Sequence, residues 1–242
     1  MSTMSSEPQR LSATAEEPAT GALPPLADPE RMLALAYAPE AVRPALHALW
    51  ALDEQFGTVV ATTREPQIGV MRLVWWRDAL ETLDQAPAPA EPLLAELAAS
   101  TLDAGVSGAT LAGMEEGWTA LLESDPPEEK AIEDHARIRG AGMFETSATL
   151  LGGAQGIDIA AAGEAWAFAD LARRLSNARA RDCAITLGRA RLPRMGAPWP
   201  RSLRPIGMLA MLAGSELRAG SAGRRGSPRR VFRAALHGLT GR

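Results

Sequence analysis

The sequence predicts an all-α fold, a single helical bundle of about nine helices, and three observations lead to this prediction. Apolar residues recur at three- and four-residue steps over most of the chain beyond residue 27. No short run alternates β-branched and polar side chains, and no Asn-Gly turn joins two such runs. The 242 residues are 46% hydrophobic and show no fixed-period repeat, which suits one sizeable core.

Residues 1–27 are predicted to be a disordered N-terminal segment, because they are rich in Ser, Thr, Ala, Glu and Pro and lack periodicity. The helical domain is expected over 28–242. Its first helix begins at Asp28, because an aspartate caps the first turn and Pro29 suits the first helical position. Pro39 ends this helix. Periodicity predicts the further helices over 42–61, 66–83, 92–102, 108–122, 127–151, 160–178, 203–218 and 228–239.

The most informative stretch is RLVWWRDALE at 72–81, because paired tryptophans are rare in a chain with 5% aromatic residues. Neighbouring residues of a helix point about 100° apart, so Trp75 and Trp76 cannot both face one cavity. One of them is expected in the core, and the other lines a cavity or a partner surface. In the same helix the spacing predicts a buried side that contains Ile68, Met71, Val74 or Trp75, and Leu80.

Two glycines fall inside the helix predicted over 127–151. Gly140 and Gly142 each cost about 1 kcal/mol relative to alanine at such positions, so they need a reason. Close approach of a neighbouring helix is one interpretation. A backbone pressed against a bound chain or ligand is the other.

The net charge of −4 conceals a strong asymmetry. Residues 183–242 contain 12 arginines and one acid, Glu216, so residues 1–182 carry a charge of −15. The basic part could pack on the acidic part of the same chain, bind an anionic membrane surface, or bind nucleic acid. No known reader motif accompanies the arginines, so we expect no nucleic-acid partner.

The helix predicted over 228–239 is amphipathic. Under one interpretation its apolar face closes the bundle. Under the other this face lies at an anionic membrane surface, which the arginines help to bind. The charged side carries Arg229, Arg230 and Arg233, and the opposite side carries Val231, Phe232, Ala235, Leu236 and Leu239.

Cysteine and histidine usage excludes common metal and disulfide sites. The single Cys183 excludes an intramolecular disulfide, and the three histidines lie too far apart for a zinc site. The first 25 residues lack the apolar core of a signal peptide, and no apolar run is long enough to span a membrane. We therefore expect a cytoplasmic protein, peripheral at the inner face of the membrane if its C-terminus binds lipid.

Four blocks resemble the squalene/phytoene synthase family, the head-to-head prenyltransferases of the isoprenoid synthase fold. They are DPERMLALAYAPEAVRPALHALWAL at 28–52, the Trp-Trp block at 69–81, HARIRGAGMFETSATLLGG at 135–153, and the segment 163–193 with its GRARLP ending. Within the family the chain is most similar to proteobacterial members that resemble the mitochondrial complex I assembly factor of this superfamily. The resemblance implies a helical bundle of the isoprenoid synthase type.

The resemblance also implies which residues an active member would need. Two facing Asp-rich motifs hold the magnesium that neutralises a diphosphate leaving group. The first motif falls on GTVVA at 57–61, which contains no carboxylate. The second falls on 170–178, where Arg174 and Ala178 occupy the aspartate positions. Losing the metal removes several kcal/mol of transition-state stabilisation, so we expect no catalytic residue and no metal ligand.

Other acids lie near both lost motifs. Asp53 and Glu54 precede the first motif by one turn, and Asp170 precedes Arg174 by one turn. They could form a displaced metal site, but a solvated or salt-bridged helix face is the favoured interpretation. Arg72, Trp76 and Arg173 are the candidates for a substrate-binding pocket, because two belong to the Trp-Trp block and the third keeps the basic position of the second motif.

Three functions follow from these observations. The favoured one is a catalytically degenerate family member that acts as a lipid-binding, assembly or interaction protein, with an apolar isoprenoid-like ligand or an anionic membrane as partner. The second is an active head-to-head prenyltransferase that condenses prenyl diphosphates in isoprenoid biosynthesis. The third is a helical adaptor unrelated to isoprenoids. Magnesium is expected as a cofactor only for the second, and no cofactor is expected otherwise.

Overall fold

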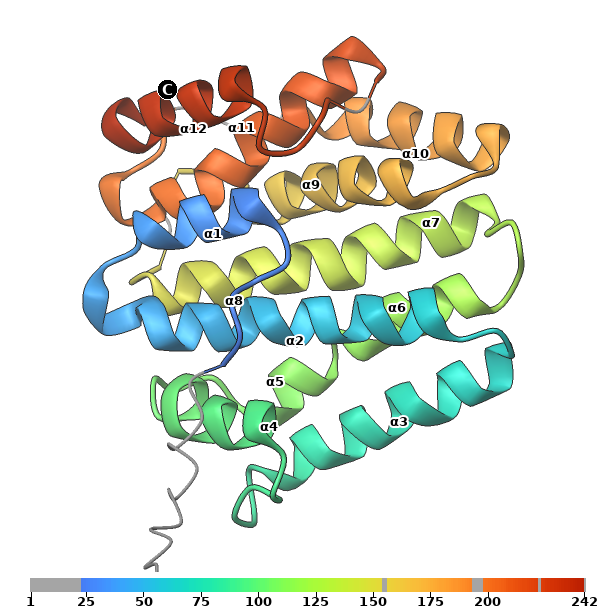
Figure 1. The fold of residues 1–242 in the computed structure, drawn as a ribbon, viewed down its shortest axis with the longest axis vertical. Helices are drawn as coiled ribbons and strands as arrows, with labels where there is room; N and C mark the ends of the chain where they lie inside the picture. Colours follow the sequence, from blue (N-terminus) through green and yellow to red (C-terminus); the bar gives the residue numbers. More distant parts are fainter. Residues whose placement is uncertain (1–22, 154–155, 193–197, 222, 242) are drawn as a thin grey trace, which may run out of the picture.

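The computed structural model describes residues 23–153, 156–192, 198–221 and 223–241. Over these ranges the regular structure is helical and contains no strand, which confirms the predicted all-α class. Figure 1 shows the helices stacked in one bundle, with α3 at one edge and α12 at the opposite edge. The α-helices are α1 (Pro29–Ala36), α2 (Arg43–Thr62), α3 (Pro66–Thr82), α4 (Pro92–Glu96), α5 (Gly108–Ala112), α6 (Glu115–Thr119), α7 (Glu129–His135), α8 (Gly142–Leu150), α9 (Ile159–Arg174), α10 (Ala178–Arg191), α11 (Arg204–Ala219) and α12 (Pro228–Thr240).

Shorter helical turns connect or extend several of these helices. Two π turns are η2 (Leu97–Leu102), which continues α4, and η4 (Ala136–Ala141), which joins α7 to α8 in one long helix. The 3-10 turns are η1 (Glu40–Val42), η3 (Ala120–Leu122) and η6 (Arg201–Leu203).

The start of the bundle follows the predicted capping. The Asp28 carboxylate accepts a hydrogen bond from the Glu30 amide at 2.9 Å, and Pro29 occupies the first turn of α1. Of the segment predicted to be disordered, residues 1–22 lie outside the described residues. Residues 23–27 lie against α2, because Leu26 is buried and the Ala27 amide donates to Glu54 at 2.7 Å.

Helix α10 is the element that periodicity did not predict. The predicted helix over 160–178 ends earlier, at Arg174, and α10 begins with Asn177, whose side chain accepts from the Ala180 amide at 3.0 Å. The helix contains five charged residues among its 14, and its buried residues are only small ones. A helix with so little apolar surface produces no clear hydrophobic period. Its buried residues are Ala180, Ala184 and Gly188.

Helix α9 is central to the bundle because 12 of its 16 residues are buried, most of them alanine or glycine. Small side chains allow neighbouring helices to approach closely on several sides. It packs against η4, α8, α10 and α11.

Helix α3 exposes a side that was predicted to be buried. Leu80 is buried as predicted, but Met71 is 71% exposed, and Ile68 is exposed as well. Of the tryptophan pair, Trp76 is buried and Trp75 is 51% exposed, so only one of the two faces the core, as predicted. The prediction failed for Ile68 and Met71 because α3 lies at the edge of the bundle and is apolar on more than one side (Figure 1).

Within the described residues, every helix is too short or too polar to cross a membrane.

Candidate functional site

The side chain of Arg139 joins α2 to α9 at the centre of the bundle. It projects from η4 and is fully buried. Its Nε donates to Asp53 Oδ1 at 2.7 Å, and its Nη2 lies 2.8 Å from Asp53 Oδ2 and 2.9 Å from Asp170 Oδ2. The carboxylates of α2 and α9 therefore converge on one guanidinium, in the bidentate geometry that arginine favours.

Two tryptophan rings enclose this guanidinium. Its central carbon lies 4.3 Å from the ring centroid of Trp118 and 4.5 Å from that of Trp166. The Trp118 Nε1 also donates to Asp53 Oδ1 at 3.1 Å. Desolvated cation–π contacts of this kind stabilise a buried charge, so the aromatic rings and the carboxylates act on Arg139 together.

Arg31, from α1, supplies a second buried guanidinium. It pairs with Asp53, and its Nη1 donates to the carbonyl oxygen of Trp50 at 2.9 Å. Its central carbon lies 5.0 Å from the Trp166 ring centroid. Asp53 is therefore held from both sides, by Arg31 and by Arg139.

The electrostatic environment keeps both carboxylates ionised. Burial alone raises the pKa of Asp53, but the guanidiniums of Arg139 and Arg31 outweigh burial and hold its pKa below the ordinary value. Burial likewise raises the pKa of Asp170, and Arg139, Arg174 and nearby arginines hold it well below the ordinary value. The site is thus a network of fixed charges.

His135 positions Arg139 from one turn earlier in the same helix. Its Nδ1 lies 2.6 Å from the Gly117 carbonyl oxygen, and its Nε2 lies 3.2 Å from Arg139 Nη1. Burial, helped by the charge of Arg139, lowers the pKa of His135 to about 3. The imidazole is therefore neutral, with Nδ1 donating to the carbonyl and Nε2 accepting from the guanidinium.

Arginines from the C-terminal segment extend the network to the first helix. Arg225 pairs with both Asp28 and Asp170. Arg230 binds both carboxylate oxygens of Glu30 and also pairs with Glu216. Part of the basic C-terminus therefore packs on acids of the same chain.

The residues present do not fit a magnesium site. Gly57 and Ala61 of the first motif and Arg174 of the second line one cavity, while Thr58 and Ala178 point to solvent. Magnesium requires several oxygen ligands in octahedral geometry. Within the described residues no three Asp, Glu, His or Cys side chains form a group that could hold a metal ion. The two carboxylates that do converge share a guanidinium instead.

The cavity beside Trp118 has a volume of about 560 Å³. One side of it is formed by the end of α2, which carries the first motif, and another by the end of α9, which carries the second. Its wall is largely apolar, and its charged residues are two arginines, Arg64 and Arg174, and two acids, Glu123 and Asp125. The apolar part of the lining includes Val60, Ala61, Leu121 and Leu171.

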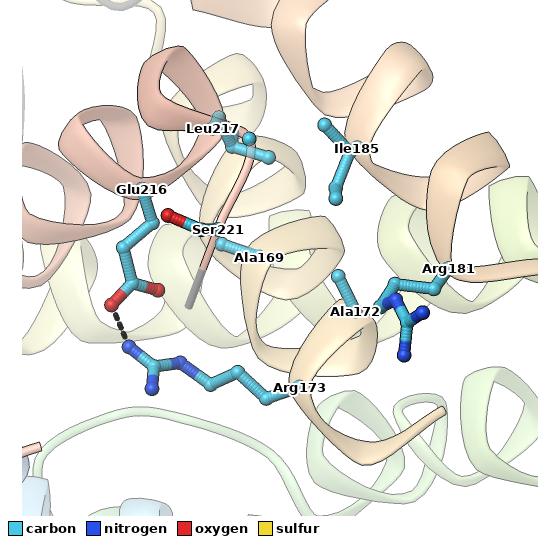
Figure 2. Close-up of a pocket in the computed structure, with 9 residues that line it drawn as sticks. Ala169, Ala172, Arg173, Arg181, Ile185, Glu216, Leu217 and Ser221 are labelled. Carbon is cyan, nitrogen blue, oxygen red and sulfur yellow. Dashed lines mark ion pairs between the residues drawn. The ribbon is translucent and has the colours of Figure 1, made fainter. Parts of the chain in front are cut away.

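A second hollow of about 340 Å³ lies between α9, α10 and α11. Figure 2 shows Arg173 extending along this hollow to pair with Glu216, while Arg181 points away from that pair. Arg173 also donates to the Gly223 carbonyl oxygen at 2.7 Å. Burial, together with Arg225 and Arg230, lowers the pKa of Arg173 to about 10.

The three candidates for substrate binding do not form one group, because Arg173 lies on a different helix from Arg72 and Trp76. Arg72 is exposed on α3, with Nη1 3.4 Å from Thr63 Oγ1. Trp76, one turn further along α3, is buried and lies edge-on to the ring of Phe56, with centroids 6.4 Å apart. Arg173 lies on α9, which α2 and the α7–α8 helix separate from α3 (Figure 1). Their role in substrate binding stays a prediction.

The charged centre itself was missed by the sequence prediction. Asp53 was expected on a solvated or salt-bridged face, and it is salt-bridged but only 1% exposed. The sequence did contain a signal for it. His135 and Arg139 are four residues apart and so lie on one side of the helix, in a stretch whose small apolar residues indicate a buried position.

Comparison with known proteins identifies one family. A family model described as squalene/phytoene synthase matches residues 25–198, which is most of the chain. The comparison with curated proteins gave no match, and the comparison with solved structures gave none either. The family match agrees with the four resembling blocks and argues against an adaptor unrelated to this family.

Proposed function

Because the chain belongs to the squalene/phytoene synthase family, we propose that it is a non-catalytic member, which binds an apolar ligand as a lipid-binding, assembly or interaction protein. One observation carries the proposal: the carboxylates nearest the lost magnesium motifs, Asp53 and Asp170, are both bound by Arg139. A positively charged group of the protein lies where those carboxylates meet. Neither carboxylate is therefore free to hold the magnesium ion that would assist the ionisation of a diphosphate.

The energetics of the network support the same conclusion. A metal ion would have to displace a buried guanidinium that makes three charge-assisted contacts and lies between two tryptophan rings. Uncovering a buried arginine in this way costs about 3–5 kcal/mol, because its charge is left unpaired. Burial lowers the pKa of Arg139, but Asp53 and Asp170 outweigh burial and hold its pKa above the ordinary value. Arg139 therefore stays protonated, and it cannot avoid the cost of an unpaired charge by losing a proton.

The 560 Å³ cavity supports binding rather than turnover. Val60, Leu121 and Leu171 form part of its apolar wall, and the charges of Arg64 and Arg174 are matched in number by those of Glu123 and Asp125. This volume lies in the range of small-molecule sites, which are mostly apolar with a few polar groups. A prenyl or other apolar chain matches such a wall.

Calorimetry with a prenyl diphosphate tests the loss of catalysis. Farnesyl diphosphate is titrated into the full chain with magnesium and with a chelator. We expect no magnesium-dependent heat and no head-to-head product after long incubation. Binding that requires magnesium, or formation of a product with a new carbon–carbon bond between two prenyl chains, would overturn the proposal.

A blocking substitution tests the cavity as the ligand site. Ala61→Trp places a large ring at the cavity wall, whereas Thr62→Trp, on the next residue, projects from an exposed position that does not line the cavity. With the uncharged prenol farnesol as probe, Ala61→Trp should weaken binding about tenfold or more, and Thr62→Trp should not. Equal affinity for both variants would place the ligand elsewhere.

A further inference from the structure

Helix α12 packs on the bundle with its small residues and turns its large apolar residues outward. Phe232 and Leu239 are each 70% exposed, and Leu236 is 48% exposed. Ala234 and Gly238, on the opposite side, are buried. The sequence left open whether the apolar side closes the bundle, and in the structure the opposite side makes the contact.

Two contacts fix this rotation of the helix. Gly238 lies against the ring of Tyr37, where an added Cβ would be 2.5 Å from a ring carbon. Arg230 reaches inward to pair with Glu30 and Glu216. Turning the apolar side inward would break both ion pairs and force a large side chain onto Tyr37.

The outward apolar ridge consists of Val231, Phe232, Leu236 and Leu239, and the charge around it is positive. Arg229 and Arg233 are exposed on the same helix, one turn apart, and Arg224 is exposed just before it. The one acid between residues 198 and 241 is Glu216, which is engaged by arginines. No carboxylate on α12 offsets the charge of these arginines.

We propose that the apolar ridge inserts into the interface of a membrane that contains anionic lipids, with Arg229 and Arg233 at the level of the headgroups. An interfacial helix combines an outward apolar side with flanking cations in this way. A second copy of the chain is a poorer occupant, because a two-fold contact through the ridge would bring like-charged arginines together. The proposal is independent of the ligand in the 560 Å³ cavity.

Vesicle flotation with the full chain tests the proposal. Vesicles of phosphatidylcholine mixed with phosphatidylglycerol are compared with vesicles of phosphatidylcholine alone. We expect the protein to float with the anionic vesicles, and the bound fraction to fall as salt is raised, because each arginine interacts with the surface potential.

Two double variants separate the apolar and the charged contributions. Phe232→Ser with Leu239→Ser should lower the partition coefficient on anionic vesicles about tenfold or more. Arg229→Gln with Arg233→Gln should lower it about fivefold per arginine, with no change on neutral vesicles. All four side chains are exposed, so each variant should keep the thermal midpoint of the wild type.

Helix α3 supplies the matched control. Met71→Ser with Trp75→Ser removes apolar residues that are 71% and 51% exposed, at the opposite edge of the bundle, and it should leave flotation unchanged. The proposal fails if the protein binds neither vesicle, or if the control variant loses as much binding as the α12 variant. It also fails if sedimentation shows a dimer that Phe232→Ser with Leu239→Ser dissociates while vesicle binding persists.

Discussion

Gly140 and Gly163 are in backbone contact where η4 crosses α9. A Cβ added to Gly163 would lie 2.2 Å from the carbonyl oxygen of Gly140, and one added to Gly140 would lie 2.5 Å from that of Gly163. The close crossing explains why a glycine occupies the middle of this long helix. It also brings Arg139, the neighbour of Gly140, to Asp170 on α9.

The first prediction concerns this crossing. Gly163→Ala should lower the free energy of unfolding by about 3 kcal/mol, because the added methyl group meets backbone that cannot move aside. Urea denaturation measures the change. Gly142→Ala is the control: its Cβ would meet only the Met114 side chain, at 3.4 Å, so this variant should be neutral or more stable by up to about 1 kcal/mol. Equal stability of Gly163→Ala and wild type would contradict the crossing.

The second prediction concerns the buried charges. Arg139→Met should destabilise the fold by about 3–5 kcal/mol, because it leaves Asp53 and Asp170 short of a partner in the interior. Arg139→Lys keeps the charge without the planar fork and should recover part of the loss. Arg77→Gln breaks an exposed pair with Asp78 and should leave the urea midpoint nearly unchanged, because solvent screens such a pair. Unfolding of Arg139→Met at the same urea concentration as the wild type would refute the role of the network.

The third prediction concerns pH. His135 has a pKa of about 3 in the folded chain, against 6.5 for an unperturbed imidazole, so the unfolded chain binds the proton more readily. Its contribution to stability is complete above pH 6.5 and falls as the pH drops. Between pH 6.5 and about pH 5 the wild type should lose about 1.5 kcal/mol through this group.

Substitution at His135 provides the comparison for this pH effect. His135→Gln removes the titrating ring, so its stability should vary less over that interval whatever its absolute value. Chemical denaturation at several pH values gives both slopes. A wild-type slope in His135→Gln would show that another group is responsible.

The fourth prediction concerns the first lost motif. At Gly57 an added Cβ would lie 2.9 Å from the Trp118 ring, so the ring occupies the space that a side chain at this position would need. Gly57→Asp should therefore cost about 2 kcal/mol and create no magnesium binding, whereas the exposed Thr58→Asp should be nearly neutral. Magnesium-dependent stabilisation of Gly57→Asp, measured by thermal unfolding, would show that the site can still be rebuilt.

The sequence was sufficient for the class of the fold because periodicity and capping act locally. Asp28 caps α1, and the helices that bury a continuous apolar stripe were all predicted. The failures have a physical cause. Helix α10 buries only small residues, and α3 is apolar on more than one side, so neither shows a single clear stripe.

The site was harder to predict because its parts come from distant segments. The loss of the Asp-rich motifs could be predicted from the sequence, because residues 57–61 contain no carboxylate and position 174 is an arginine. The charged network around Arg139 could not be predicted in this way, because Asp53 and Arg139 are 86 residues apart in the sequence. Only the packing of α2, η4 and α9 brings them together. Local spacing contains no information about such a contact.

The ion pairs that join the first helix to the last have a consequence for synthesis of the chain. Glu30 meets Arg230 across 200 residues, and Asp28 meets Arg225 across 197. On a ribosome that adds about 5–20 residues per second, the acids of α1 wait roughly 10–40 seconds for these partners. During that time these two acids lack the arginines that neutralise them in the folded chain. The family match ends at residue 198, before either arginine, so a nascent chain of that length contains the matched region but not the groups that close the structure.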